Sequence, residues 1–249
     1  MKNNIKKHLA FAGAALLAAG ITTQAQALTV DVFNVSTQEA EIDAWINSLG
    51  GQTTVLEDFE NLSTGWYQSL ATGIGTFSIT DNTLAGTGSS SYDRKVGTED
   101  GAWFEVRDYD ANGRYNTTDP GSQYLDSADI TELSLNVTDN TLNNLFFFMT
   151  DPSDVRATTT ASTGGISDTV DYRQSNGSLW FIGIDAGDDF ISEIIWSVNH
   201  WDTGNAYTND GFGLDDFSTV SAVPLPGAVW LFGSVLAGFV GFKRFKKKS

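Results

Sequence analysis

The sequence predicts an all-β protein, an antiparallel β-sandwich with one N-terminal helix, and three observations lead to this prediction. From Val55 onward, short runs of β-branched and aromatic residues are separated by Gly, Asn, Asp, Ser and Thr. Some runs, such as Glu132–Val137, alternate between apolar and polar side chains, which is typical of half-buried strands. Only Ser36–Gly51 shows the period of a soluble helix. About nine strands with turn-rich connections indicate a sandwich of the jelly-roll type.

The two ends of the chain carry segments that we separate from this fold. Met1–Ala27 combines three lysines, an apolar stretch Leu9–Ile21 and the pattern Ala25-Gln26-Ala27, which predicts a secretory signal peptide. Near the other end, Leu225–Phe242 carries no charge and would cover roughly 27 Å as a helix, enough to cross a bilayer's hydrocarbon core. The Lys and Arg residues that follow are expected to stay on the cytoplasmic side. The predicted divisions are a signal peptide at 1–27, a strand and helix segment at 28–54, a β-sandwich domain at 55–222 and a C-terminal transmembrane segment at 223–249.

The C-terminal segment resembles a known sorting signal. The residues Val223, Pro224, Leu225 and Pro226 precede Gly227–Ser234 and the basic end, and this arrangement is similar to the PEP-CTERM signal of exopolysaccharide-producing Gram-negative bacteria. Leu225 stands where the name-giving motif has Glu. The resemblance implies an exosortase-type sorting transpeptidase as partner, an initial membrane-anchored stage, and a final location at the cell surface or in the extracellular matrix. A permanent membrane anchor is the alternative interpretation.

The predicted mature body is strongly acidic. It holds all 31 Asp and Glu of the chain but only six of the 14 Lys and Arg, which gives a formal charge of −25. Such a surface repels nucleic acid and anionic lipid and favours cations, so we expect no nucleic-acid partner. The chain has no Cys, which excludes disulfides and cysteine-based zinc sites.

Ser36–Gly51 is predicted to be the soluble helix. Ser36 and Glu39 have the spacing of a capping box, and Gly50-Gly51 supplies a stop. The residues that form its apolar stripe are Ile42, Trp45, Ile46 and Leu49. Because a helix of this length is marginal by itself, the stripe must pack on the β domain.

Nine segments are predicted to be strands: Val55–Glu60, Gly75–Thr80, Ala102–Arg107, Glu132–Val137, Leu145–Thr150, Thr169–Arg173, Leu179–Asp185, Ile191–Asn199 and Gly213–Val220. Leu145–Met149 and Leu179–Ile184 are apolar on both faces, so we place them centrally in a sheet. Ala157–Ser167 and Gly86–Ser91, rich in small and polar residues, are predicted to be loops. Three tryptophans on strands are assigned to the core: Trp103, Trp180 and Trp196.

The 108–119 segment has the oxygen pattern of a calcium-binding loop. Counted from Asp108, oxygen-bearing side chains occupy positions 1, 3, 5, 9 and 12, glycine occupies position 6, and position 7 needs only a backbone carbonyl. The predicted ligands are Asp108, Asp110, Asn112, Arg114 through its carbonyl, Asn116 and Asp119. An Asp- and Asn-rich turn uses the same residue types, so the calcium loop and the simple turn stay equal alternatives.

A second acidic group lies at the two ends of the β domain. Glu57–Glu60 belongs to the first predicted strand and Asp210–Phe217 leads into the last, and these strands are commonly neighbours in a jelly roll. The carboxylates predicted to meet there are those of Asp58, Glu60, Asp215 and Asp216. Carboxylates this close either bind a cation or have raised pKa values, and we predict a structural calcium ion. This frame resembles MAM-type and carbohydrate-binding jelly rolls, which implies architecture more than activity.

The sequence favours a binding protein over an enzyme. No Gly-x-Ser-x-Gly elbow surrounds a serine, and His200, at a predicted strand end, is more typical of a surface histidine, so we assign no catalytic residue. A glycosidase needs only two carboxylates and stays open as an alternative. Glu105, Glu132 and Glu193, however, are expected on solvent faces.

Sugar binding is the predicted activity, because the CH face of a sugar stacks on an aromatic ring beside polar groups. The predicted ligand-binding residues are Trp201, Asp202 and Tyr115. The chain is thus predicted to be a calcium-stabilised, carbohydrate-associated surface module. A purely structural or adhesive surface protein and a polysaccharide hydrolase or lyase are the alternatives.

Overall fold

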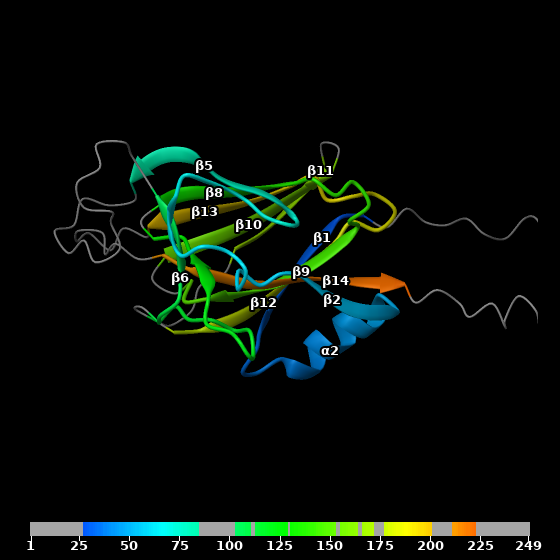
Figure 1. The fold of residues 1–249 in the computed structure, drawn as a ribbon. Coiled ribbons are helices and arrows are strands. Elements are labelled where there is room, and N and C mark those ends of the chain that lie inside the picture. The colour runs from blue at the N-terminus through cyan, green and yellow to red at the C-terminus, as the bar shows by residue number, and fades with distance from the viewer. Residues whose placement is uncertain are drawn as a thin grey trace, which may run out of the picture.

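The computed structural model describes residues 27–84, 103–110, 113–128, 130–152, 155–163, 166–171, 177–200 and 211–222. Within them, two antiparallel β-sheets pack face to face, and a helix lies against the outside of one sheet (Figure 1). This confirms the predicted all-β sandwich. The predicted signal peptide (apart from Ala27) and the predicted C-terminal segment lie outside the described residues. Within the described part of the chain, no helix is both long and apolar enough to cross a bilayer.

The first sheet has eight strands in the order β1-β12-β9-β14-β7-β6-β3, and β2 also pairs with β14. Their bounds are β1 Thr29–Asn34, β2 Gly51–Glu57, β3 Gly65–Tyr67, β6 Phe104–Arg107, β7 Tyr124–Asp126, β9 Asn144–Thr150, β12 Leu179–Asp185 and β14 Gly213–Ala222. The second sheet has six strands in the order β11-β10-β13-β8-β5-β4. Their bounds are β4 Ser69–Ala71, β5 Gly75–Leu84, β8 Ile130–Val137, β10 Val155–Thr163, β11 Ile166–Asp171 and β13 Glu193–His200.

One predicted loop is in fact a β-hairpin. Ala157–Ser167 falls mostly within β10 and continues into β11, and the two strands pair from Thr158 with Asp171 to Thr163 with Ile166. The prediction was wrong because the segment is rich in Thr, which looks polar but is β-branched and fits a pleated strand. The other predicted loop, Gly86–Ser91, lies outside the described residues.

The core lies between the two sheets and is built around aromatic rings. Phe77 and Trp196 of the second sheet meet Phe147 and Phe217 of the first, with ring centroids 5.5 to 6.1 Å apart across the sheets. These four side chains are fully buried. Trp196 and Trp180 belong to this core, as predicted, whereas Trp103 is only partly buried.

Strand β9 is central, as its continuous apolar run predicts. It lies between β12 and β14, so both of its edges are paired. Phe147 packs into the core between the sheets, whereas its neighbours Phe146 and Phe148 belong to a second apolar cluster on the opposite face. Alternate residues of a strand point to opposite faces, so a strand buried on both sides must be apolar throughout.

Helix α2 (Glu39–Ser48) covers that opposite face. Its predicted stripe packs on the first sheet in a cluster that includes Ile42, Trp45, Ile46, Leu49, Phe146, Phe181 and Val220. The Trp45 ring lies 5.4 Å from that of Phe181, and its indole N–H donates to Asp31 Oδ2 at 3.0 Å. Gly183 makes room for this ring, because an added Cβ would lie 2.6 Å from the indole.

The predicted capping box is wrong, although the predicted stop is confirmed. The helix begins at Glu39, and no side chain caps its first turn. Ser36 instead donates its hydroxyl to Asn34 Oδ1 at 2.6 Å, because Asn34 places an acceptor two residues away. Gly50 ends the helix with a φ of 68°, a conformation that glycine adopts without steric cost.

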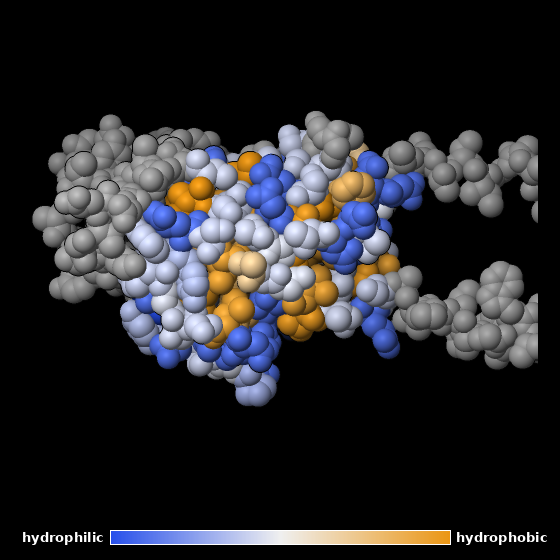
Figure 2. All heavy atoms as spheres, turned by 45° about the horizontal axis from the view of Figure 1, so that its top comes forward, coloured by the Kyte–Doolittle hydropathy of each residue, from blue (hydrophilic) through white to orange (hydrophobic). Residues whose placement is uncertain are grey.

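The pairing of the strands shows which residues lie at each end of the sandwich. Asn34, Leu179 and Gly213 lie at one end of the first sheet. Ala27 and Ala222, where the described body begins and ends, lie at the other end (Figure 1). The face seen in Figure 2 is mostly polar, with apolar residues in small separate groups.

Candidate functional site

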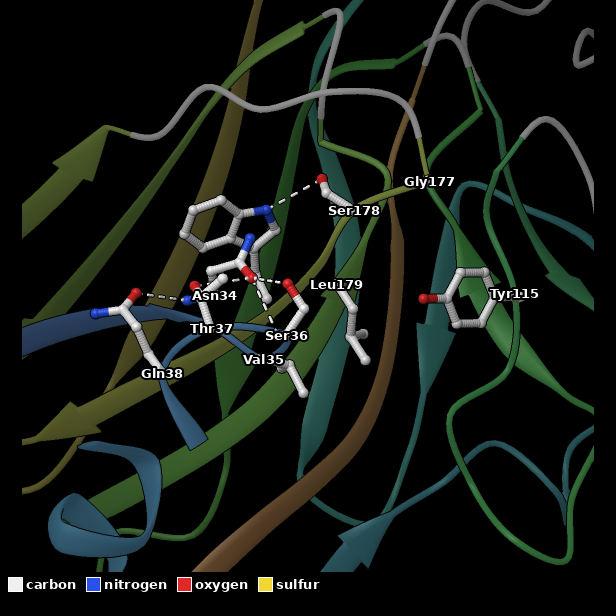
Figure 3. Close-up of a pocket in the computed structure, with 10 residues that line it drawn as sticks. Asn34, Val35, Ser36, Thr37, Gln38, Tyr115, Gly177, Ser178 and Leu179 are labelled. Atoms are coloured by element: carbon white, nitrogen blue, oxygen red, sulfur yellow. Dashed lines mark hydrogen bonds between the residues drawn. The ribbon is translucent and has the colours of Figure 1, made fainter. Parts of the chain in front are cut away.

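A pocket of about 660 Å³ opens where β1 ends and β12 begins (Figure 3). Pockets that bind small ligands commonly have volumes of about 300–1,000 Å³. The residues that line it are Asn34, Val35, Ser36, Thr37, Gln38, Tyr115, Gly177, Ser178, Leu179 and Trp180. The pocket thus joins three separate stretches of sequence.

The first stretch is the turn between β1 and α2, which Asn34 organises. Its Oδ1 accepts hydrogen bonds from the Ser36 backbone N–H at 3.0 Å and from the Ser36 hydroxyl at 2.6 Å. Its carbonyl oxygen accepts from the N–H groups of Thr37 and Gln38. In return, the Asn34 N–H donates to Gln38 Oε1 at 2.9 Å. These bonds fix the turn before any ligand arrives.

The second stretch, Gly177–Trp180, is tied to the end of β9. Gly177 has a φ of 73° and donates its N–H to Asp151 Oδ1 at 2.6 Å, while the Asp151 N–H donates to the Ser178 carbonyl at 2.8 Å. Asp151 is itself fully buried. The Trp180 indole N–H donates to Ser178 Oγ at 3.1 Å, which fixes the orientation of this lining residue.

The third stretch contributes Tyr115, a predicted ligand-binding residue. Figure 3 shows its ring on the opposite side of Leu179 from Ser36, with the hydroxyl directed toward the other lining residues. Burial raises the pKa of the Tyr115 hydroxyl, and the negative charges of Asp110 and Asp151 raise it further. The phenol is therefore neutral at physiological pH. The ring is also partly exposed, so a ligand can stack on it.

The segment that carries Tyr115 is held by two adjacent carboxylates. Asp215 Oδ2 accepts from the N–H groups of Thr117 at 2.7 Å and Thr118 at 3.2 Å. The hydroxyls of Thr117 and Thr118 donate to the Asp216 oxygens at 2.8 and 2.6 Å. Adjacent strand residues normally point to opposite faces. Here the register of β14 shifts between Asp215 and Ser218, and Asp216 has a φ of 55°, so both carboxylates reach the same segment.

Asp215 is an unusual carboxyl group. Its side chain is almost completely buried, and this burial raises its pKa to about 7. The nearby charge of Asp216 also raises the pKa, while hydrogen bonds from Thr117 and from the Asp216 backbone lower it. The charge state of this group therefore changes near neutral pH.

Arg114, next to Tyr115, belongs to a buried ion-pair cluster. The Arg107 guanidinium lies 2.7 Å from Glu105 Oε2 and 3.0 Å from Asp126 Oδ2, and Arg114 Nε lies 3.2 Å from the same Asp126 oxygen. All four residues are at most 8% exposed. The predicted solvent position of Glu105 is wrong, because Arg107, two residues on and on the same face of β6, pairs with it.

Two of the predicted calcium ligands in the 108–119 segment take part in other contacts. The Arg114 carbonyl oxygen accepts a hydrogen bond from the Tyr124 hydroxyl at 3.2 Å. Asn116 Oδ1 accepts from the Thr118 N–H at 3.0 Å, and Asn116 Nδ2 donates to the Thr118 carbonyl. This part of the segment therefore adopts the Asx turn that the sequence left as the alternative.

The other predicted ligands of this segment are Asp108, Asp110 and Asp119, which are exposed, and Asn112, which lies outside the described residues. Among the described residues, no group of three or more Asp, Glu and His side chains is placed to hold a metal ion. Calcium in this segment stays a prediction of the sequence.

The second acidic group is divided between two contacts. Strands β2 and β14 pair, as predicted, with Glu57 opposite Phe217. Glu60 Oε1 accepts from the N–H groups of Ser122 and Gln123, each at 2.6 Å, and Asp58 Oδ1 accepts from the Glu60 N–H. Glu60 thus holds one end of the 113–123 segment, whereas Asp215 and Asp216 hold its middle.

The pocket includes residues that no local sequence pattern identified, namely the 34–38 turn and Gly177–Trp180. Pairing of β1 with β12 brings them together, with Asn34 opposite Trp180. The predicted ligand residues Trp201 and Asp202 and the predicted sorting residues Val223, Pro224, Leu225 and Pro226 lie outside the described residues.

Comparison with known proteins gives little further information. No protein-family model matches the chain, and no curated protein matches it. One similar solved structure is the enzymatically active domain of tailspike protein 4 of bacteriophage CBA120, with 11% identity and a TM-score of 0.29. The match covers 66% of this chain and 20% of that chain.

Proposed function

We propose that this protein is an exported surface or extracellular-matrix protein whose pocket binds carbohydrate. The observation that carries the proposal is the pocket itself, where Tyr115 faces uncharged polar side chains fixed by hydrogen bonds. A sugar-binding site uses both features: the CH face of the sugar stacks on the aromatic ring, and the short polar side chains form hydrogen bonds with the sugar hydroxyls. A site that is already ordered loses less conformational entropy on binding.

The export part of the proposal is supported by the sequence patterns at both ends of the chain. A signal peptide at 1–27 would direct the body out of the cytoplasm. The motif from Val223 to Pro226 and the basic end would then make the chain a substrate of an exosortase-type enzyme. The intact mass of the protein released from secreting cells tests this, since cleavage near Val223 predicts loss of the last residues. Full-length protein found in the cytosol would contradict it.

A jelly-roll connectivity and a structural calcium ion belong to the same proposal. The calcium is supported by the oxygen pattern of 108–119 and by the −25 formal charge of the predicted body. Its role would be to stabilise the body rather than to act in chemistry.

Substitution of Tyr115 tests the carbohydrate site. Tyr115→Ala removes the stacking surface and is expected to weaken binding of the best glycan ligand about tenfold, equivalent to about 1.4 kcal/mol. Isothermal titration with oligosaccharides measures the affinity. Phe190→Ala is the matched control, because Phe190 is an aromatic residue that is 45% exposed and is not among the described lining residues.

Three outcomes would contradict the proposal. Equal glycan affinity in Tyr115→Ala and the parent protein would place binding elsewhere. Absence of binding to any glycan would favour a structural or adhesive surface protein. Release of reducing ends or unsaturated products would favour a polysaccharide hydrolase or lyase.

A further inference from the structure

None of the lining residues that the structure describes carries a charge. Its polar side chains are the amides of Asn34 and Gln38 and the hydroxyls of Ser36, Thr37, Tyr115 and Ser178. The amide oxygens of Asn34 and Gln38 already accept hydrogen bonds within the turn. These two amides can therefore offer a ligand their N–H donors. The hydroxyls of Ser36 and Thr37 donate to Asn34 Oδ1, so they offer a ligand their acceptor oxygens, whereas the Tyr115 hydroxyl can donate or accept. This set matches the hydroxyl and acetamido groups of a sugar.

Two described carboxylates, those of Asp110 and Asp151, act on the pocket lining. Asp151 is fully buried beside Gly177, and its Oδ1 accepts from the Gly177 N–H at 2.6 Å. Asp151 and Asp110 also act on Tyr115, since their charges, together with its burial, raise the pKa of the hydroxyl. A field that disfavours a negative phenolate at this position disfavours a ligand carboxylate in the same place.

The two described arginine side chains form ion pairs away from the pocket. Arg107 and Arg114 are at most 2% exposed and pair with Glu105 and Asp126, and neither lines the pocket. A uronate, sulfate or phosphate group moved from water into the pocket would lose hydration without gaining a described positive partner. The remaining Arg and Lys residues of the body are Arg94, Lys95, Arg156 and Arg173, whose side chains lie outside the described set.

We infer that the pocket selects uncharged sugars, such as neutral hexoses and N-acetylated hexosamines, over acidic sugars. This inference rests on the proposed carbohydrate function and adds the class of ligand to it. Two features would give this selectivity. The uncharged hydrogen-bonding groups of the lining bind neutral sugars, and the nearby carboxylates repel an anionic sugar.

The test compares oligosaccharides of equal length by isothermal titration with the full predicted body. Neutral oligomers of glucose, mannose, galactose and N-acetylglucosamine form one set, and oligogalacturonate is the acidic probe. We expect the best neutral ligand to bind at least about tenfold more tightly than oligogalacturonate. Its affinity should change little between low and high salt, because no ion pair forms.

Two variants sharpen this test. Thr37→Arg places a cation on the exposed turn of the lining and is expected to raise the ratio of oligogalacturonate affinity to neutral-sugar affinity at least about tenfold. Arg173→Gln should leave the preference unchanged. Oligogalacturonate binding as tightly as the neutral ligands, or a preference that depends on Arg173, would overturn the inference while the carbohydrate function stands. Absence of binding by every probe would overturn both.

Discussion

Besides the Glu60 contact at its end, two polar clusters hold the segment that carries Tyr115, and they do so in different ways. In the first, Arg107 and Arg114 pair with Glu105 and Asp126, so two buried cations balance two buried anions. In the second, Asp215 and Asp216 accept hydrogen bonds from neutral hydroxyl and N–H groups of Thr117 and Thr118. Counting the described residues, the first cluster is compensated in charge, whereas the second contains two carboxyl groups and no cation.

This difference predicts different weaknesses. A compensated cluster is stable while it is complete, but it leaves a buried charge without its partner when one member is removed. An uncompensated carboxylate pair can lower its charge by taking up a proton, so its stability depends on pH. The Tyr115 segment thus depends on one contact that is sensitive to mutation and one that is sensitive to pH.

The largest effect is expected from breaking the compensated cluster. Asp126→Asn keeps the shape of the side chain but leaves Arg107 and Arg114 with one fewer anion, which should lower the free energy of unfolding by about 3–5 kcal/mol. Urea denaturation measures it. Asp188→Asn, at an exposed position, is the matched control and should stay within about 0.5 kcal/mol of the parent protein. A loss below about 1 kcal/mol for Asp126→Asn would remove the distinction between the clusters.

The next largest effect is expected from pH. The pKa of Asp215 is raised from 3.8 to about 7 in the folded protein, so the folded state holds a proton that the unfolded state has released. The stability from this group is fully present below about pH 4 and is lost as the pH rises through 7, on the order of a few kcal/mol. Asp215→Asn should flatten the fall in unfolding free energy between pH 5 and 7. An unchanged slope in this variant, compared with Asp188→Asn, would show that other groups cause the pH dependence.

A smaller effect is expected from the hydroxyl donors. Thr117→Val removes the donor to Asp215 Oδ2 at 3.0 Å and to Asp216 Oδ2 at 2.8 Å, at a cost of about 1–2 kcal/mol. Because the segment also positions Tyr115, glycan affinity should fall with stability. Thr54→Val, on the exposed part of β2, makes the same chemical change without these partners. Equal stability and affinity in the two variants would show that the second cluster does not hold the segment.

The smallest effect is expected from calcium, because several of the predicted ligands already accept hydrogen bonds from the protein. A weak extracellular-type site with a Kd of about 0.1–1 mM would add about 0.4–1.4 kcal/mol at 1 mM calcium. Thermal unfolding with calcium and with chelator measures this, and Asp110→Asn should remove it. Identical unfolding curves at 10 mM calcium and in chelator would leave the 108–119 segment as a turn.

The sequence predicted those parts of the fold that depend on local periodicity. The run of Phe146–Phe148 predicted a central strand because each side chain faces one of two apolar clusters. The stripe of α2 was predicted because residues three and four apart share a helix face. The composition of Ala157–Ser167 predicted a loop, and this failed because Thr is polar in composition but β-branched in shape.

The site was less predictable because it depends on contacts between distant segments. An aromatic ring among polar neighbours predicts Tyr115 as a ligand-binding residue, and Tyr115 lies in the pocket lining. No local pattern predicts Asn34 and Ser178, since only the pairing of β1 with β12 brings them together. The ion-pair cluster had one readable signal: Glu105 and Arg107 carry opposite charges two residues apart on one strand and thus share a face.

The position of the pocket along the sheet has a consequence for how the protein would work on a cell. The pocket lies at the end of the sandwich where β14 begins, and Ala222 lies at the opposite end. With the following residues anchored as the sequence predicts, the ten residues of β14 would act as a spacer of roughly 30 Å. While such an anchor is in place, the pocket would lie at the end of the body far from the membrane, where several copies that contact one long polymer would gain avidity from weak individual contacts.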